Sequence, residues 1–393
     1  MGLRGWLTRQ AVAGAHVLVV EVPGAWSTRV AVEQALAQRG WQYAVSPADA
    51  DVLVVCGRPG EQLAAAVDVL WEHLPGPRTR VGVASASEAG RALADAEAQL
   101  LDDRKQREEA RQRPTSPALL AESHDSPMDH GDMDHGDMDH GDMDHGDMDM
   151  SGPGGIALAG GGPDRDGLAM DVLHLPLGPV LPHWPPGLVL RCALQGDVIS
   201  ESEVEVLDPV AAAHPPVSAP RLAAQHCDVA ADLLAVAGWD SMAATARRHR
   251  DLILAAAASA SAPGPASASA FECVAALERV TTRIARSRTL RWALRDLGIV
   301  DDAVLAGHRL PESTRGDVHD RLLRLLVSAG DLLRDQPAPA PVPDPSPVLA
   351  ALPALVHGLD IGAARLVVAS LAPLPVESAA HAPAPADPAG GHA

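Results

Sequence analysis

The chain has 393 residues, enough for two ordinary domains and their connecting segments. Its formal net charge of −20 disfavours nucleic acid and anionic membrane surfaces as partners. The cysteines Cys56, Cys192, Cys227 and Cys273 show no CxxC spacing and are scattered, as is typical of a protein of the reducing cytoplasm. Residues 1–14 lack the apolar core of a secretory signal, and no run of about 18 apolar residues exists. We therefore expect a cytoplasmic protein without direct membrane insertion.

Short apolar runs alternate with helical patterns through the first 101 residues. The runs HVLVVEV and DVLVVC are typical of buried strands, and each ends at a Gly or Pro-Gly turn. Strands are predicted over 16–22, 41–45, 51–56 and 80–84, and helices over 27–39, over 61–74 and from 87 onward. This alternation predicts a small parallel sheet with helices on both faces, an α/β flavodoxin-like domain over residues 15–101.

Residues 102–167 are predicted to connect this domain to a second one. The nearly all-charged stretch 102–113 is expected to prolong the last helix into solvent, until Pro114 ends it. Residues 114–166 combine loop residues, a tandem repeat and a Gly-rich stretch. We expect them to form one disordered linker.

The linker contains the sequence MDHGD four times in tandem over residues 128–147. Each unit supplies a thioether, which suits Cu(I), and an imidazole with carboxylates, which suit Cu(II), Ni(II) or Zn(II). The repeat is therefore either a copper, nickel or zinc site or a solvated acidic linker expanded by replication slippage. The candidate metal ligands are His130, His135, His140, His145, Met133, Met138, Met143, Asp134, Asp139 and Asp144.

The second half of the chain begins with extended segments and then becomes helical. Strands over 171–175, 188–194 and 198–206 are predicted, the last two as a β-hairpin that turns at Gly196-Asp197. Helices are predicted over 221–237, 241–258, 270–297 and 315–334, with two short ones within 348–371. The expected divisions are a hairpin and mainly α domain over 168–335, a Pro-Ala linker with short helices over 336–372, and a disordered tail over 373–393.

Two stretches of the first domain carry a resemblance to a known family. They are SPADADVLVVCG over 46–57 and VDVLWEHLPGPR over 67–78. On these residues the first domain resembles the B subunit of bacterial NADH–quinone oxidoreductase (complex I), which is itself similar to the small subunit of nickel–iron hydrogenases.

Two stretches of the second domain resemble the D subunit of the same enzyme. Gly178-Pro179, Pro182 and the segment GLVLRCALQGD over 187–197 are similar to its N-terminal hairpin. The segment RGDVHDRL over 315–322 is similar to its Gly-Asp-Val-Tyr-Asp-Arg motif, with His319 in place of the Tyr. Because the two resemblances occur in order in one chain, the chain looks like a fused, degenerate relative of both subunits.

The residues that would perform the family's chemistry are missing. The B family holds a four-iron cluster through cysteine thiolates, but the matching segments here, PGAWSTR over 23–29 and ASAS over 84–87, contain no Cys. The D family lines its quinone pocket with a His and a Tyr. Here Leu181 takes the His position, with His183 close by, and the second domain has no Tyr. We therefore expect no iron–sulfur cluster, no catalytic residue and no cofactor-binding residue.

Two pairs of polar residues have both a functional and a structural interpretation. His183 and Trp184 could line a pocket, or they could belong to a Pro-rich loop that packs the Trp side chain. Asp317 and Arg321 lie four residues apart in a helical segment and are expected to form an ion pair on the helix surface.

Two short segments have the same two interpretations. The cluster Arg247, Arg248, His249 and Arg250 is expected to be a solvated helix face that could also dock the acidic linker. Residues 58–60 follow the end of a strand, where α/β folds bind ligands, but no GxGxxG sequence is present and no NAD site is expected.

The sequence favours an accessory or interaction protein related to the B–D module of complex I. Its expected partners are subunits of a respiratory or hydrogenase-like complex. The alternatives are a copper- or nickel-binding protein that acts through the MDHGD repeat, and an oxidoreductase subunit that uses a cofactor of its partner.

Overall fold

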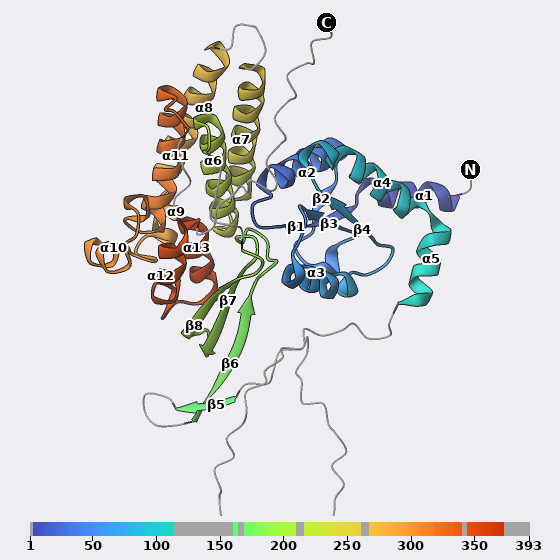
Figure 1. Cartoon of the computed structure of the whole chain (residues 1–393), viewed down its shortest axis with the longest axis horizontal. Helices are drawn as coiled ribbons and strands as arrows, with labels where there is room; N and C mark the ends of the chain where they lie inside the picture. Colours follow the sequence, from blue (N-terminus) through green and yellow to red (C-terminus); the bar gives the residue numbers. More distant parts are fainter. Residues whose placement is uncertain are drawn as a thin grey trace, which may run out of the picture.

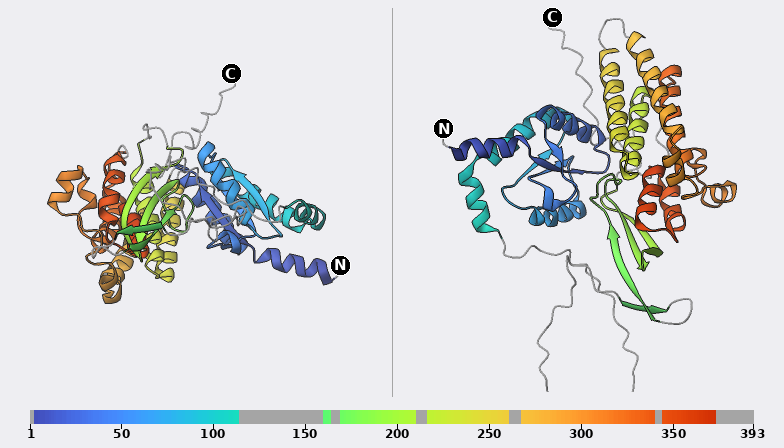
Figure 2. Two further views of the ribbon diagram at one scale, coloured as in Figure 1. Left: turned by 90° about the horizontal axis from the view of Figure 1, so that it is seen from below. Right: turned by 180° about the vertical axis from the view of Figure 1, so that it is seen from behind.

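The computed structural model describes residues 3–113, 160–163, 169–209, 216–260, 267–339 and 344–372. The N-terminal part forms an α/β domain, and the C-terminal part forms an antiparallel sheet covered by helices (Figures 1 and 2). Among the described helices, none combines the length and the apolar character that a membrane crossing needs.

The α/β domain contains the predicted parallel sheet, with the strand order β2-β1-β3-β4. Successive residues of β1 and β3 point to opposite faces, so Val17 and Val52 pack with α2 and α4 while Leu18 and Leu53 pack with α3. Both faces are covered, which explains why these strands are continuous apolar runs. The bounds are β1 His16–Glu21, β2 Gln42–Tyr43, β3 Val52–Cys56, β4 Thr79–Val83, α2 Trp26–Arg39, α3 Glu61–His73 and α4 Ala89–Leu101, with 3₁₀ turns at Pro47–Asp49 and Ala86–Glu88.

Two helices at the ends of this domain differ from the prediction. Helix α1, Leu3–Ala13, precedes the expected start of the domain at residue 15, and its Val12 is buried in the core beside α4. Residues 102–113 do not prolong α4, because Asp102 leaves the helical conformation and its carboxylate caps a new helix, α5, Asp103–Gln112. Helix α5 then turns back onto the domain, where Glu109 pairs with the buried Arg78 at 2.6 Å.

The antiparallel sheet has the strand order β5-β6-β7-β8 and contains the predicted hairpin. The strands are β5 Gly160–Pro163, β6 Ala169–Leu177, β7 Leu188–Gln195 and β8 Val198–Val206. Strand β5 falls within residues 114–166, which the sequence predicted to be a linker, and the described part of that segment is this short strand. Its sequence, GGGP, has no alternation of apolar and polar residues from which a strand could have been predicted.

The remaining helices share one apolar core with the inner-facing residues of this sheet, and α12 packs directly on β8. The predicted helix 270–297 is divided, because the Ser287 side chain accepts a hydrogen bond from Leu290 N and starts a separate helix. A short helix at 302–308 was not predicted, and α12 and α13 pack in the same core as the helices of 168–335. The bounds are α6 Ala219–Val236, α7 Asp240–Ala260, α8 Ser267–Ala285, α9 Arg288–Leu294, α10 Asp302–His308, α11 Val318–Asp335, α12 Ser346–Val356 and α13 Ile361–Leu371, with a 3₁₀ turn at Glu312–Thr314.

The two domains share part of their core. Trp26 and Val30 of α2 are buried with apolar residues of the helical domain, among them Ala224 and Cys227 of α6. Figure 2 shows the α/β domain beside the helices and the upper end of the antiparallel sheet. The interface therefore lies next to the carboxyl end of β1, from which α2 begins.

Candidate functional site at the domain interface

Five charged residues meet where β1 and α2 face the helical domain. Glu21 ends β1, Arg29 and Glu33 lie on α2, Asp228 lies on α6 and Arg250 lies on α7. We refer to these five residues as the interface charge cluster. Its members are nearly enclosed, with exposed side-chain fractions of 2% for Arg250, 5% for Asp228 and 12% for Glu21.

The two arginines of the cluster bridge its three carboxylates. Arg29 donates to Glu21 at 2.5 Å and also to Glu33 and Asp228, while Arg250 donates to Glu33 at 2.5 Å and to Asp228 at 2.6 Å. The Trp26 indole Nε1 donates to Asp228 Oδ2 at 2.7 Å. Asp228 therefore accepts hydrogen bonds from both arginines and from Trp26, and it joins the two domains.

Three carboxyl groups against two guanidinium groups leave an unbalanced buried charge if every group is ionised. Burial raises the pKa of Glu21 to about 7, and the attraction of Arg29 offsets only part of that effect. Burial acts in the same direction on Asp228, but Arg29 and Arg250 outweigh it and hold the pKa of that carboxyl well below its usual range. Glu21 is therefore the member that takes up a proton near neutral pH.

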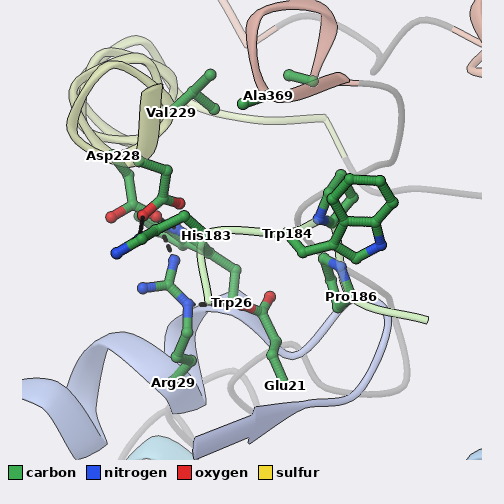
Figure 3. A pocket seen from close by; sticks show the side chains of 12 residues that line it. Glu21, Trp26, Arg29, His183, Trp184, Pro186, Asp228, Val229 and Ala369 are labelled. Carbon is green, nitrogen blue, oxygen red and sulfur yellow. Dashed lines mark hydrogen bonds and ion pairs between the residues drawn. The ribbon is translucent and has the colours of Figure 1, made fainter. Parts of the chain in front are cut away.

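A small cavity adjoins the cluster (Figure 3). It has a volume of about 80 Å³ and is lined by Glu21, Arg29, Asp228, His183 and Trp184, among others. This volume is far below the roughly 300 Å³ of a small ligand pocket. The cavity has room for only a few water molecules beside the Glu21 carboxyl group.

The loop before β7 places two aromatic side chains at this cavity. His183 Nδ1 lies 2.9 Å from Asp232 Oδ1, and Arg247 Nη2 donates to the same carboxylate oxygen at 3.2 Å. Trp184 packs in the Pro-rich loop and donates from Nε1 to Leu188 O at 2.7 Å. Both interpretations of this dipeptide therefore hold, because the His lines the cavity while the Trp stabilises the loop.

The predicted solvated face at 247–250 is wrong for its last member. Arg250 is 1% exposed and lies in the interface charge cluster, while Arg247 pairs with Asp232. Helix α7 turns this end of the segment toward the carboxylates of α2 and α6. Of this segment, Arg250 therefore serves the domain interface, whereas Arg248 remains exposed.

The predicted surface ion pair between Asp317 and Arg321 is also wrong. Arg321 is 2% exposed and donates to Gly298 O, Gly316 O and Ser370 Oγ at 2.6 to 2.9 Å, as well as to Thr314 O. Asp317 caps α11, and the Asp320 side chain accepts from the backbone N–H of Asp317 in return. Asp317, His319 and Asp320 carry possible metal ligands within 4.8 Å of one another, but both carboxylates already serve this cap.

The end of the predicted segment 58–60 and the first turn of α3 form a contact between the domains. The Asp208 carboxylate, which follows β8, accepts from Leu63 N at 2.9 Å, and Asp208 N donates to the Gln62 side chain. A Cβ on Gly60 would lie 2.3 Å from the Asp208 side chain, so any larger residue here would displace that carboxylate. The start of α3 is thus occupied by a carboxylate of the second domain.

The cysteine thiols do not form a ligand set for a four-iron cluster. Cys56 is buried on β3 in the core of the α/β domain, and burial raises the pKa of its thiol well above the usual value. The others lie apart from it on β7, α6 and α8, in the second domain. Trp26 and Arg29 occupy the segment after β1 where the resemblance places cluster thiolates.

The predicted metal ligands on the repeat all lie outside the described residues. Sequence reasoning did not identify Glu21, Arg29, Glu33 or Asp228. One signal was available, because Asp228 interrupts the apolar face of the predicted helix over 221–237. Comparison of the sequence with models of protein families and with curated proteins gave no match.

Proposed function

We propose that this chain is an accessory or interaction protein related to the B–D module of NADH–quinone oxidoreductase. It holds a B-like and a D-like domain in one fixed arrangement and carries no iron–sulfur cluster of its own. Its proposed partners are subunits of a respiratory or hydrogenase-like complex, and its proposed compartment is the cytoplasm.

The observation that supports this proposal most strongly is the composition of the domain interface. In the B subunit that the first domain resembles, the segment after the first strand supplies thiolates to a redox centre. In this chain the same segment supplies Trp26 and Arg29, which both bind Asp228 of the other domain. Groups that hold two domains together have replaced groups that would hold iron.

We expect the purified protein to take up no stoichiometric iron–sulfur cluster, because no four thiolates converge among the described residues. The test is anaerobic reconstitution, followed by iron and sulfide analysis and visible absorption. A brown protein with stoichiometric iron and sulfide would contradict the accessory role and support an oxidoreductase subunit. Co-purification of the tagged chain with respiratory or hydrogenase-like subunits would support the partner assignment.

The repeat supports a second candidate function, the binding of Cu(II) or Ni(II) by its four histidines. Neutral imidazole is the competent ligand, so we expect the affinity to fall as the pH drops through about 6.5. Titration calorimetry on the natural chain and on a variant with His130, His135, His140 and His145 changed to Ala measures this binding. Equal metal binding by both proteins would remove the repeat from any metal function.

A further inference from the structure

Helix α9 carries a row of arginines on its outer face. Leu290 and Leu294 are buried, whereas Arg288, Arg291 and Trp292 are exposed on the opposite side. With Arg295 at the end of the helix, the outer residues follow the spacing i, i+3, i+4 and i+7, which places them on one face. The exposed fraction of Trp292 is 72%, the largest among the exposed large apolar residues of the described chain.

These arginines make almost no ion pairs with the described residues, although Asp317 and Asp320 lie near His319 beside Arg291. The guanidinium groups of Arg283, Arg286, Arg288 and Arg291 make no hydrogen bond or ion pair with any described residue, and Arg295 only approaches the exposed Asp296 at 3.8 Å. Other arginines of this acidic chain are paired, for example Arg29, Arg78 and Arg250. Like charges three and four residues apart destabilise a short helix. An anionic partner bound to this face would reduce that repulsion and so stabilise α9.

A groove lies beside the segment that leads into α9. It runs between α8 and α11, has a volume of about 480 Å³ and is lined by Leu277, Leu326 and Val327, with the charge of Glu278 balanced by Arg334 at 2.6 Å. Arg286, which lies two residues before α9, also lines it. The groove and the α9 arginines, which we together call the arginine face, combine an apolar channel with unpaired positive charge.

We propose that the arginine face binds the acidic MDHGD tract, residues 128–150, of the same chain. The tract carries nine Asp, whose negative charges can pair with the unpaired arginines of this face. It also places a Met at every fifth position. Methionine fills irregular apolar gaps and makes favourable contacts with aromatic rings, which suits the groove and the exposed Trp292. This inference is independent of the accessory function proposed above.

The chain is long enough for this contact. The middle of the tract lies about 25 residues beyond Arg113 and about 20 residues before Gly160, which allows extended spans of up to roughly 85 and 70 Å. A chain of this size has a radius of gyration of roughly 20 Å. Because the tract is tethered, its effective concentration at the arginine face is high, and weak individual contacts are sufficient for occupancy.

The test uses a fluorescently labelled peptide with the sequence of residues 128–150, in buffer with EDTA, and fluorescence anisotropy as the readout. The receiving protein is the full chain with the nine Asp of its own tract changed to Asn, which keeps its length. We expect this variant to bind the peptide at least ~10-fold more tightly than the natural chain does, because the natural tract competes for the same face. Binding should weaken with added salt.

A second pair of variants locates the binding surface. In the nine-Asn background, Arg288→Gln, Arg291→Gln and Arg295→Gln together should weaken peptide binding ~10-fold or more. The matched control, Arg104→Gln, Arg107→Gln and Arg111→Gln on α5, removes the same charge and should change binding less than ~2-fold. All six side chains are exposed, so circular dichroism should show that both variants remain folded.

Three results would overturn the proposal. The first is equal peptide binding by the α9 and α5 variants, and the second is equal binding by the natural and nine-Asn chains. The third is self-association of the natural chain, measured by sedimentation, that the α9 substitutions abolish, because the occupant would then be the tract of a second copy.

Discussion

Replacement of Asp228 by Ala is expected to lower the free energy of unfolding by about 3–5 kcal/mol, the usual result of removing one partner from a buried ion pair. The change leaves Trp26 Nε1 without its acceptor and deprives Arg29 and Arg250 of the carboxylate that they share. Two guanidinium groups then remain buried against Glu33 and a Glu21 that takes up a proton near neutral pH. Urea unfolding followed by circular dichroism and Trp fluorescence measures the loss.

Two comparison variants show whether buried charge is the cause. Asp68→Ala removes the exposed partner of Arg80 and should cost less than about 1 kcal/mol. The double variant Asp228→Leu with Arg250→Met removes one charge of each sign, so it should be more stable than Asp228→Ala alone. A loss at Asp228 no larger than the loss at Asp68 would show that the interface charge cluster does not stabilise the fold.

The sequence predicted the α/β domain well because burial governs its pattern. Val17, Leu18, Val52 and Leu53 lie in strands covered on both faces, so their apolar runs were sufficient to place the sheet. The hairpin was also evident, since Gly196 supplies the positive φ that its turn requires. By contrast, the capping function of Asp102 was hidden among other charged residues that all favour a helix.

The interface charge cluster could be predicted only in part. The helical spacing of Ala224, Cys227 and Ala231 indicates that Asp228 shares their buried face, so its need for a partner follows from the sequence. The identity of that partner does not follow, because Arg29 lies 199 residues away in another domain. In the same way, Arg321 could not be assigned to the carbonyl groups of Gly298 and Gly316, since backbone acceptors have no sequence signature.

Glu21 is expected to make the stability of this protein fall as the pH rises toward neutrality. Its pKa is raised from 4.5 to about 7 in the folded chain, so the folded state keeps a proton that the unfolded state releases. The stabilisation from this group is fully present below pH 4.5 and is lost as the pH rises through about 7. A shift of this size corresponds to roughly 3 kcal/mol.

A second buried group acts in the opposite direction over an overlapping range. Burial lowers the pKa of His226 from 6.5 to about 4, so the unfolded state binds the proton first as the pH falls. The contribution of His226 is present above pH 6.5 and is lost as the pH falls through about 4. The two effects partly cancel in the natural protein, and its own pH profile therefore cannot isolate Glu21.

The variant Glu21→Gln separates the effect of Glu21 from that of His226, because it removes the titrating carboxyl group and leaves His226 unchanged. We expect the difference in unfolding free energy between the variant and the natural chain to shift by roughly 3 kcal/mol in favour of the variant between pH 4.5 and 7.5. Urea unfolding at intervals across this range measures that difference. Glu97→Gln, an exposed change on α4, is the control and should leave the difference flat. If Glu21→Gln gives the same flat difference, then the Glu21 carboxyl group is ionised in the folded protein across this range, and the charge balance assigned to the cluster is wrong.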